Sequence, residues 1–221
     1  MADDDARSGL PACMPDPDDL HVMGRVLAGI CTANGYMAVA NTLVSLSWLT
    51  LSVVAATSLQ VCDDFWQIQK LVVATTALSC LEVVHAAVGL TRSKPGNVIL
   101  FVGARAFIAL YICPLAGCSA TYRTTAFTWG LGECIRLGCF AVDAVRPSVT
   151  AKTVRYTVGP IMFPIGSLGE WVLLIGAMRD GRPALWAPVI GWPIGFAVLM
   201  RQLLAQRRKH LKGLADKSKG L

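Results

Sequence analysis

The chain has 221 residues, of which 54% are hydrophobic and only 15% are charged, and its mean hydropathy is +0.55. This composition excludes an ordinary soluble domain and is typical of a compact membrane protein. The net charge of +6 is unevenly spread, because residues 1–30 are acidic whereas residues 205–221 are strongly basic. A basic segment beside an apolar one is typical of the cytosolic flank of a membrane helix, which argues against nucleic-acid binding.

Six segments of about 20 mostly apolar residues are predicted to cross the membrane as helices. In chain order they are residues 36–59, 68–90, 97–115, 125–142, 154–178 and 183–204. The fourth is the least hydrophobic of them. We therefore expect an all-α fold, with a six-helix membrane domain at residues 31–204 around an interior polar cavity. A disordered acidic segment at residues 1–30 precedes this domain, and a basic cytosolic tail at residues 205–221 follows it.

Positive charges predict how these helices are oriented. If six helices alternate across the membrane, the basic connections after the second and fourth helices lie on the same side as the basic tail. The acidic connection QVCDDFWQ lies on the other side, and Arg179 and Arg182 are outnumbered exceptions. Both termini are thus expected in the cytosol. The last five residues, KSKGL, resemble the dilysine signal for retrieval to the endoplasmic reticulum, so we expect a multi-pass protein of that membrane.

The sequence predicts no metal site and no cofactor. HExxH, the Walker loop and the glycine pattern of dinucleotide-binding folds are absent, and the three histidines are scattered along the chain. Among the eight cysteines, Cys62, Cys113 and Cys118 lie at segment ends on one predicted side. A disulfide among these three is compatible with the sequence but is not required by it.

Ionisable residues are costly at bilayer depth and usually face the interior of a helix bundle. The apolar segments contain six of them: Glu82, His85, Arg105, Glu133, Arg136 and Glu170. A polar cavity would explain them, but so would structural pairing. Glu133 and Arg136 are three residues apart and could neutralise each other, and Glu82 could pair with Arg105 across two helices. His85 is expected to be a hydrogen-bonded interior histidine.

Glu170 differs from the other interior charges, because no basic residue lies within one helical turn of it. An apolar environment disfavours the charged form of such a carboxyl, and a carboxyl in this position can transfer protons. The structural alternative is a glutamate hydrogen-bonded to a neighbouring helix. The same segment contains Pro160 and Pro164, which bend helices, and Gly166 and Gly169, which allow close helix approach.

Tyr156, Phe163 and Glu170 are spaced by seven residues and therefore share one face of a continuous helix. The rise of 1.5 Å per residue places Tyr156 about 21 Å from Glu170 along the helix axis. Tyr156 is thus too far from Glu170 to contact it directly.

The stretch VRYT…FPIGSLGE, at residues 154–170, resembles the signature of the very-long-chain 3-hydroxyacyl-CoA dehydratases, also called protein tyrosine phosphatase-like membrane proteins. The likeness extends along the chain from about residue 36 and includes LEVVHAAVGLTRS, WGLGECIR and AQRRKHLK. It implies a six-helix enzyme of the endoplasmic reticulum that eliminates water from a (3R)-3-hydroxyacyl-CoA to give the trans-2-enoyl-CoA, the third step of fatty-acid elongation. It also implies an acyl-CoA substrate, the lipid bilayer as surroundings and other elongation enzymes as candidate partners.

The catalytic pair of that family is a Tyr and a Glu in the pattern Y-P-x-G-x-x-x-E. In this chain Glu170, Pro164 and Gly166 match the pattern, but Phe163 stands at the Tyr position. The resemblance implies a substrate pocket that also includes Arg105, Glu133, Arg136, Arg155 and Tyr156. The CoA head group is expected at the cytosolic mouth near Arg92, Lys94, Lys152 or Arg155.

Three functions are compatible with these residues. The first is an active dehydratase with Glu170 as the proton-transfer group. The second, favoured by Phe163, is a catalytically weakened or inactive relative that binds acyl-CoA or scaffolds elongation enzymes. The third is a small transporter, which the bent helix allows but for which no internal repeat is visible. The sequence argues against phosphatase activity, because no Cys is followed six residues later by an Arg.

Overall fold

The computed structural model describes residues 32–58, 64–91, 93–179 and 183–219, and every element within these ranges is helical. The predicted segment at residues 1–30, Cys62 and Arg92 lie outside the described residues. In chain order the elements are α2 (Ala33–Thr57), α3 (Phe65–Ala87), α4 (Pro95–Phe107), the π-helix η1 (Ile108–Ile112), α5 (Cys113–Ala116), α6 (Ala120–Val145), α7 (Val149–Arg179), the short 3₁₀-helix η2 (Pro183–Leu185) and α8 (Trp186–Lys219). The all-α prediction is confirmed for this part of the chain.

Within the described residues, five helical runs are long and apolar enough to cross a membrane, as in a multi-pass membrane protein. They are α2, α3, the continuous run from Pro95 to Ala116, α7 and α8. The expected segment at residues 125–142 forms the middle of α6, which does not have the apolar composition of the other five. Six membrane crossings therefore remain a prediction.

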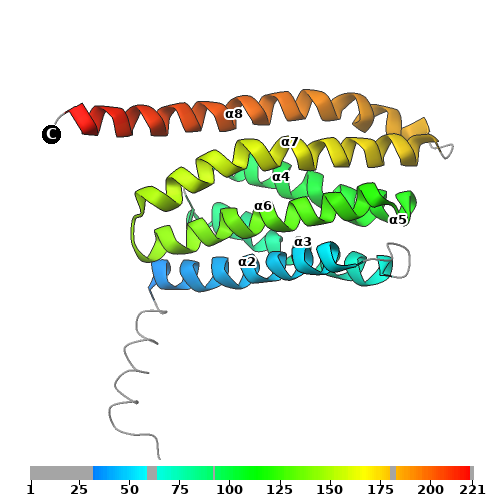
Figure 1. Cartoon of the computed structure of the whole chain (residues 1–221), viewed down its shortest axis with the longest axis horizontal. Helices are drawn as coiled ribbons and strands as arrows, with labels where there is room; N and C mark the ends of the chain where they lie inside the picture. Colours follow the sequence, from blue (N-terminus) through cyan, green and yellow to red (C-terminus); the bar gives the residue numbers. More distant parts are fainter. Residues whose placement is uncertain (1–31, 59–63, 92, 180–182, 220–221) are drawn as a thin grey trace, which may run out of the picture.

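The helices are arranged so that α6 lies between α2 and α7, while α8 lies along α7 on the outside of the bundle (Figure 1). Gly130 allows α6 to approach α2 closely, because a Cβ atom there would lie 2.6 Å from the Trp48 carbonyl oxygen. Two serines of α2 bind α6 directly: Ser45 and Ser52 donate to the carbonyl oxygens of Cys134 and Phe127. This close contact holds the polar middle of α6 inside the bundle.

Helix α7 runs unbroken through Pro160 and Pro164. Each proline removes one helical hydrogen bond, and Figure 1 shows α7 changing direction near its middle, as expected for a proline-containing helix. The helix begins at Val149, five residues before its predicted start. Its C-terminal half, which contains Glu170, contacts α6 and the first half of α8.

The structure extends one sequence expectation and narrows another. Helix α8 does not end near residue 204 but continues through the basic tail to Lys219, because residues 205–219 contain no proline and many good helix formers. Cys118 is disulfide-bonded, whereas Cys113 is a free thiol buried in the core. Of the disulfides compatible with the sequence, those that include Cys113 are therefore ruled out.

Candidate active site

The carboxylate of Glu170 is held by two tryptophans from two other helices. Trp129 Nε1 of α6 donates to Glu170 Oε1 at 2.6 Å, and Trp192 Nε1 of α8 donates to Glu170 Oε2 at 3.1 Å. An indole N–H can only donate, so each bond requires a carboxylate oxygen as acceptor. Both oxygens of a half-buried carboxylate are thus fixed by neutral donors, and none of the ion pairs found among the described residues includes Glu170.

Two glycines of α7 explain how α6 comes close enough to make this contact. A Cβ atom at Gly166 would lie 3.5 Å from the Trp129 ring, and one at Gly169 would overlap the Thr125 hydroxyl. A side chain at Gly169 would therefore have to displace Thr125 or push α6 and α7 apart, whereas a Cβ atom at Gly166 would make ordinary contact with the Trp129 ring. The expectation that Gly166 and Gly169 permit close helix approach is met here.

Phe163 faces α8 and offers no group that can transfer a proton. Its ring is stacked on Phe196 of α8, with centroids 5.4 Å apart and ring planes 8° from parallel. It lies on the same face of α7 as Glu170, two helical turns earlier. Pro164, the next residue, lies inside the unbroken helix.

The remaining interior charges form one connected ion-pair network. Arg136 donates from Nη1 to Glu82 Oε2 at 2.9 Å and from Nε to Glu133 Oε2 at 2.9 Å. Arg105 Nη2 donates to Glu133 Oε1 at 3.0 Å. The predicted pairing of Glu133 with Arg136 is confirmed, but the predicted pairing of Glu82 with Arg105 is wrong. Glu82 and Arg105 each pair instead with a residue of α6, although α3 and α4 pack directly against each other.

Trp129 connects this network to Glu170. The Arg105 guanidinium lies over the Trp129 ring at 5.5 Å and over the rings of Trp48 and Phe101 at 5.1 and 4.7 Å. Arg105 and Glu133 are almost completely buried. The network therefore fixes the indole whose N–H binds Glu170, so that its charges act as a support for the carboxylate.

Arg155 and Tyr156 do not reach this site. Arg155 Nη2 donates to Tyr156 Oη at 3.1 Å, and the Tyr156 ring lies 5.1 Å from the ring of His210 near the end of α8. Along the axis of α7 they are about 21 Å from Glu170. The residues predicted to line one pocket are thus divided into two groups. One group lies near Glu170, whereas Arg155 and Tyr156 lie near the start of α7.

The other predicted features are placed as follows. His85 is buried, and its Nε2 atom lies 2.9 Å from Tyr36 Oη, so it is a hydrogen-bonded interior histidine as expected. Hollows of about 360 and 230 Å³ lie at α6–α7 and at α2–α6 respectively, and neither is lined by Glu170. The predicted cavity around the interior charges is not seen there. No group of His, Cys, Asp and Glu in the described residues could hold a metal ion.

Sequence reasoning did not assign Trp129 and Trp192 to the site. They lie in the stretches WGLGECIR and GWPIG, and each is an interior donor that needs an acceptor. The need of each indole N–H for an acceptor was the only sign of this role in the sequence. That the acceptors are the two oxygens of Glu170 became visible only in the packed helices.

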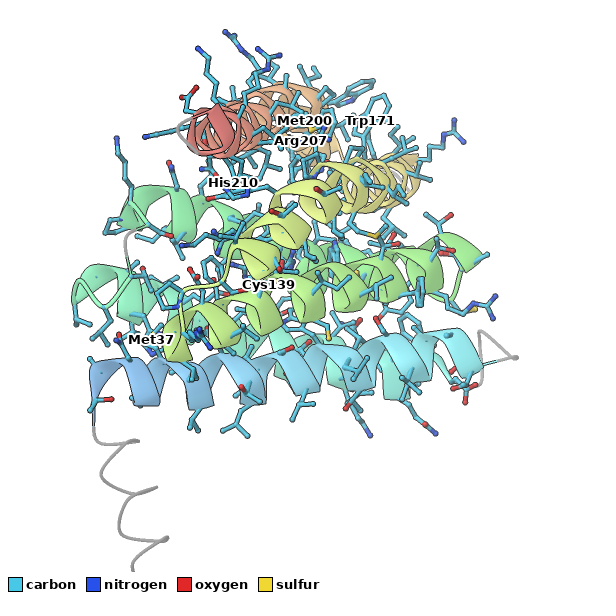
Figure 2. All side chains as sticks on the ribbon, turned by 60° about the vertical axis from the view of Figure 1, so that its left-hand side comes forward. Met37, Cys139, Trp171, Met200, Arg207 and His210 are labelled. Atoms are coloured by element: carbon cyan, nitrogen blue, oxygen red, sulfur yellow. The ribbon has the colours of Figure 1, made fainter. Side chains whose placement is uncertain are left out.

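Comparison with known proteins matches residues 76–213 to the family described as Protein tyrosine phosphatase-like protein, PTPLA. The matched region is more than half of the chain and contains Glu170, Trp129 and the whole ion-pair network. The chain belongs to this family. Figure 2 shows how side chains of three of the matched helices, Cys139 of α6, Trp171 of α7 and Met200 of α8, are distributed over the bundle.

Two relatives of this PTPLA member extend the comparison. It is 26% identical over 162 residues to a very-long-chain (3R)-3-hydroxyacyl-CoA dehydratase of Caenorhabditis elegans, which covers 62% of this chain and 74% of the relative. It is 28% identical over 165 residues to a probable very-long-chain (3R)-3-hydroxyacyl-CoA dehydratase of Schizosaccharomyces pombe, with 68% and 78% covered. No solved structure matches the chain significantly. The family predicted from the sequence is thus shown.

Proposed function

We propose that this protein is a very-long-chain (3R)-3-hydroxyacyl-CoA dehydratase in which Glu170 transfers the protons. The observation that carries the proposal is the Glu170 carboxylate, which occupies the glutamate position of the family motif and is oriented by Trp129 and Trp192. Neutral donors fix its oxygens without a salt bridge, so the carboxylate can gain and lose a proton at a defined position.

The elimination can be written with Glu170 as the only acid–base group. One carboxylate oxygen removes the proton from C2 of the substrate, and the electron pair of that C–H bond forms the C2–C3 double bond. The C3–O bond breaks, and the proton now on Glu170 passes to the departing hydroxyl, which leaves as water. The carboxylate is thereby restored, and no oxidant, reductant or further reactant is required.

Phe163 makes this reaction slower than with a tyrosine. A phenol at that position could protonate the leaving hydroxyl while the glutamate removes the C2 proton, whereas the stacked phenyl ring of Phe163 cannot. Losing one of two acid–base groups lowers rates by about 10²–10⁴-fold. We therefore expect slow turnover.

The Phe163–Phe196 stack also favours a second candidate function, a catalytically inactive family member that binds acyl-CoA or scaffolds other elongation enzymes. The stack closes the contact between α7 and α8 with apolar groups. On this alternative Glu170 is structural, and its role is to join α6, α7 and α8.

One experiment separates the two functions. The purified protein is assayed for enoyl-CoA formation as wild type, Glu170→Gln, Phe163→Tyr and Phe196→Tyr. The last variant is a matched control, because it adds the same hydroxyl to the other ring of the stack. An active dehydratase loses turnover in Glu170→Gln and gains it in Phe163→Tyr but not in Phe196→Tyr. A wild type without turnover, together with a gain in Phe163→Tyr, would establish the inactive alternative.

We further propose that the protein resides in the endoplasmic reticulum membrane with both termini in the cytosol. It crosses the membrane six times, and α6 is the span added to the five apolar helical runs. Support comes from the concentration of Lys and Arg at the ends of α7 and α8 that lie beside each other. Glycosylation acceptor sites inserted into successive connections test the topology, because acceptors are modified only on the lumenal side. Modification of an acceptor placed after Lys219 would contradict it.

A further inference from the structure

The ends of α7 and α8 that lie far from Glu170 form a second polar cluster. His210 Nε2 of α8 lies 3.0 Å from Thr153 Oγ1 of α7, and its ring contacts Tyr156, which accepts a hydrogen bond from Arg155. Arg207 precedes His210 by one helical turn and therefore shares its face of α8. Figure 2 shows Arg207 and His210 near each other at this end of α8. His210 thus anchors the basic end of α8 on the start of α7, with Arg207 beside it.

Arg155 and Arg207 carry positive charges that no carboxylate of the described residues pairs with. The Arg155 guanidinium lies over the rings of Phe140 and Tyr156 at 4.4 and 4.8 Å. Arg207 Nε is buried and has no hydrogen-bond partner among the residues that the structure describes. Nearby Lys152, in contrast, is 3.4 Å from Asp143. Because buried donors are normally satisfied, the free Arg207 Nε indicates a missing acceptor, and two neighbouring guanidinium charges without a carboxylate indicate that this acceptor is anionic and not part of this chain.

The stripe of α7 that contains Glu170 leads directly to this cluster. Tyr156, Phe163 and Glu170 lie on one face, and each contacts α8, through His210, Phe196 and Trp192 respectively. About 21 Å of helix axis separates Tyr156 from Glu170. The pantetheine arm of CoA is about as long as four extended residues from its sulfur to its first phosphate, roughly 15 Å. Long arginine side chains span the remainder, so a thioester at Glu170 brings the phosphates to Arg155 and Arg207.

We propose that Arg155 and Arg207, positioned by Tyr156 and His210, bind the phosphate groups at the nucleotide end of coenzyme A. The assignment deepens the proposed dehydratase function and presupposes its acyl-CoA substrate. Planar guanidinium groups match phosphate oxygens in pairs, which a lysine ammonium does not. A phospholipid head group at the membrane surface offers the same phosphate chemistry, so the test includes both sources.

The test measures CoA affinity by calorimetry with the full chain in discs of uncharged lipid. Arg155→Gln and Arg207→Gln are each expected to weaken CoA binding about tenfold or more, as for the loss of a charge-assisted hydrogen bond. Arg208→Gln is the matched control, because Arg208 is exposed on the next position of the same helix, and its CoA affinity should equal that of wild type. Pantetheine without phosphates should bind equally to all variants.

Several results would overturn the assignment. One is an unchanged CoA affinity in both glutamine variants. Another is a loss of binding to anionic phospholipid vesicles in those variants while CoA affinity stays constant, because the phosphate would then be that of a lipid. If a glutamine variant does not fold, the lysine variant at the same position replaces it, and undiminished CoA affinity there also counts against the proposal.

Failure of this site and failure of the dehydratase function give different results. Glu170→Gln should abolish turnover but leave CoA affinity unchanged, since Glu170 lies at the other end of α7. A wild type that binds CoA through Arg155 and Arg207 without turnover would keep the phosphate site and reject the enzyme. Turnover that does not depend on Arg155 and Arg207 would support the dehydratase function and reject the phosphate site.

Discussion

The bundle interior contains two kinds of polar group, which differ in the partners that they contact. Glu82, Glu133, Arg105 and Arg136 meet opposite charges at hydrogen-bond distance, whereas Glu170 meets only neutral indole donors. Paired charges stabilise each other and have little tendency to exchange protons. A carboxylate that is hydrogen-bonded only to neutral donors can still gain and lose a proton. We therefore assign a structural role to the network and a chemical role to Glu170.

Glu170→Gln tests the chemical role of the carboxylate directly. We expect turnover to fall about 10²–10⁴-fold, because the amide cannot accept and return a proton. Stability should fall by only about 1 kcal/mol, since the amide nitrogen cannot accept one of the two indole hydrogen bonds. Turnover assays and thermal unfolding in the same membrane mimetic measure the two effects. A large loss of stability with unchanged turnover would assign Glu170 to the structural class.

Arg136→Met tests the structural role of the ion-pair network. The substitution leaves Glu82 and Glu133 without their shared partner, and breaking a buried ion pair costs about 3–5 kcal/mol. We expect a markedly lower unfolding temperature. Lys152→Met is the control, because the Lys152 side chain is more exposed than that of Arg136 and exposed ion pairs contribute about 0–1 kcal/mol. Equal effects of the two substitutions would show that the network is not structural.

Trp129→Phe sharpens the connection between the two regions. The phenyl ring can still pack beneath Arg105, but the 2.6 Å bond to Glu170 is lost. Hydrogen bonds to charged groups contribute about 1.5–3 kcal/mol, so we expect kcat to fall about tenfold or more. Trp192→Phe removes the longer bond at 3.1 Å and should have the smaller effect. If Trp192 proves the more sensitive, α8 rather than α6 orients the carboxylate.

The smallest expected effect concerns the helix contact that brings the two regions together. Gly169→Ala places a methyl group on Thr125, and such overpacking destabilises by about 1–3 kcal/mol. Gly176→Ala is the control on the same helix, because nothing lies within 4 Å of its Cβ position, and it should be neutral or stabilising by about 0.5–1 kcal/mol. Chemical unfolding of both variants measures the difference. A neutral Gly169→Ala would mean that α6 and α7 can separate without cost.

From the amino-acid sequence alone we predicted the family, the helical fold, the position of Glu170 and the replacement of a tyrosine by Phe163. The sequence also predicted the Glu133–Arg136 pair, because residues three apart meet on one helical face whatever the rest of the fold. These features depend on composition and on the period of a single helix. For the same reason, the distance between Tyr156 and Glu170 along α7 follows from the helical rise per residue alone.

Only the tertiary structure decided which helices supply the partners. Trp129 and Trp192 are 41 and 22 residues from Glu170 in sequence, and Glu82 is 54 residues from Arg136. Such pairs depend on the rotation and register of neighbouring helices, which are set by close contacts at Gly130, Gly166 and Gly169. Helical periodicity shows which face a residue occupies but not which helix packs against it, so these partners could not be predicted from the sequence alone.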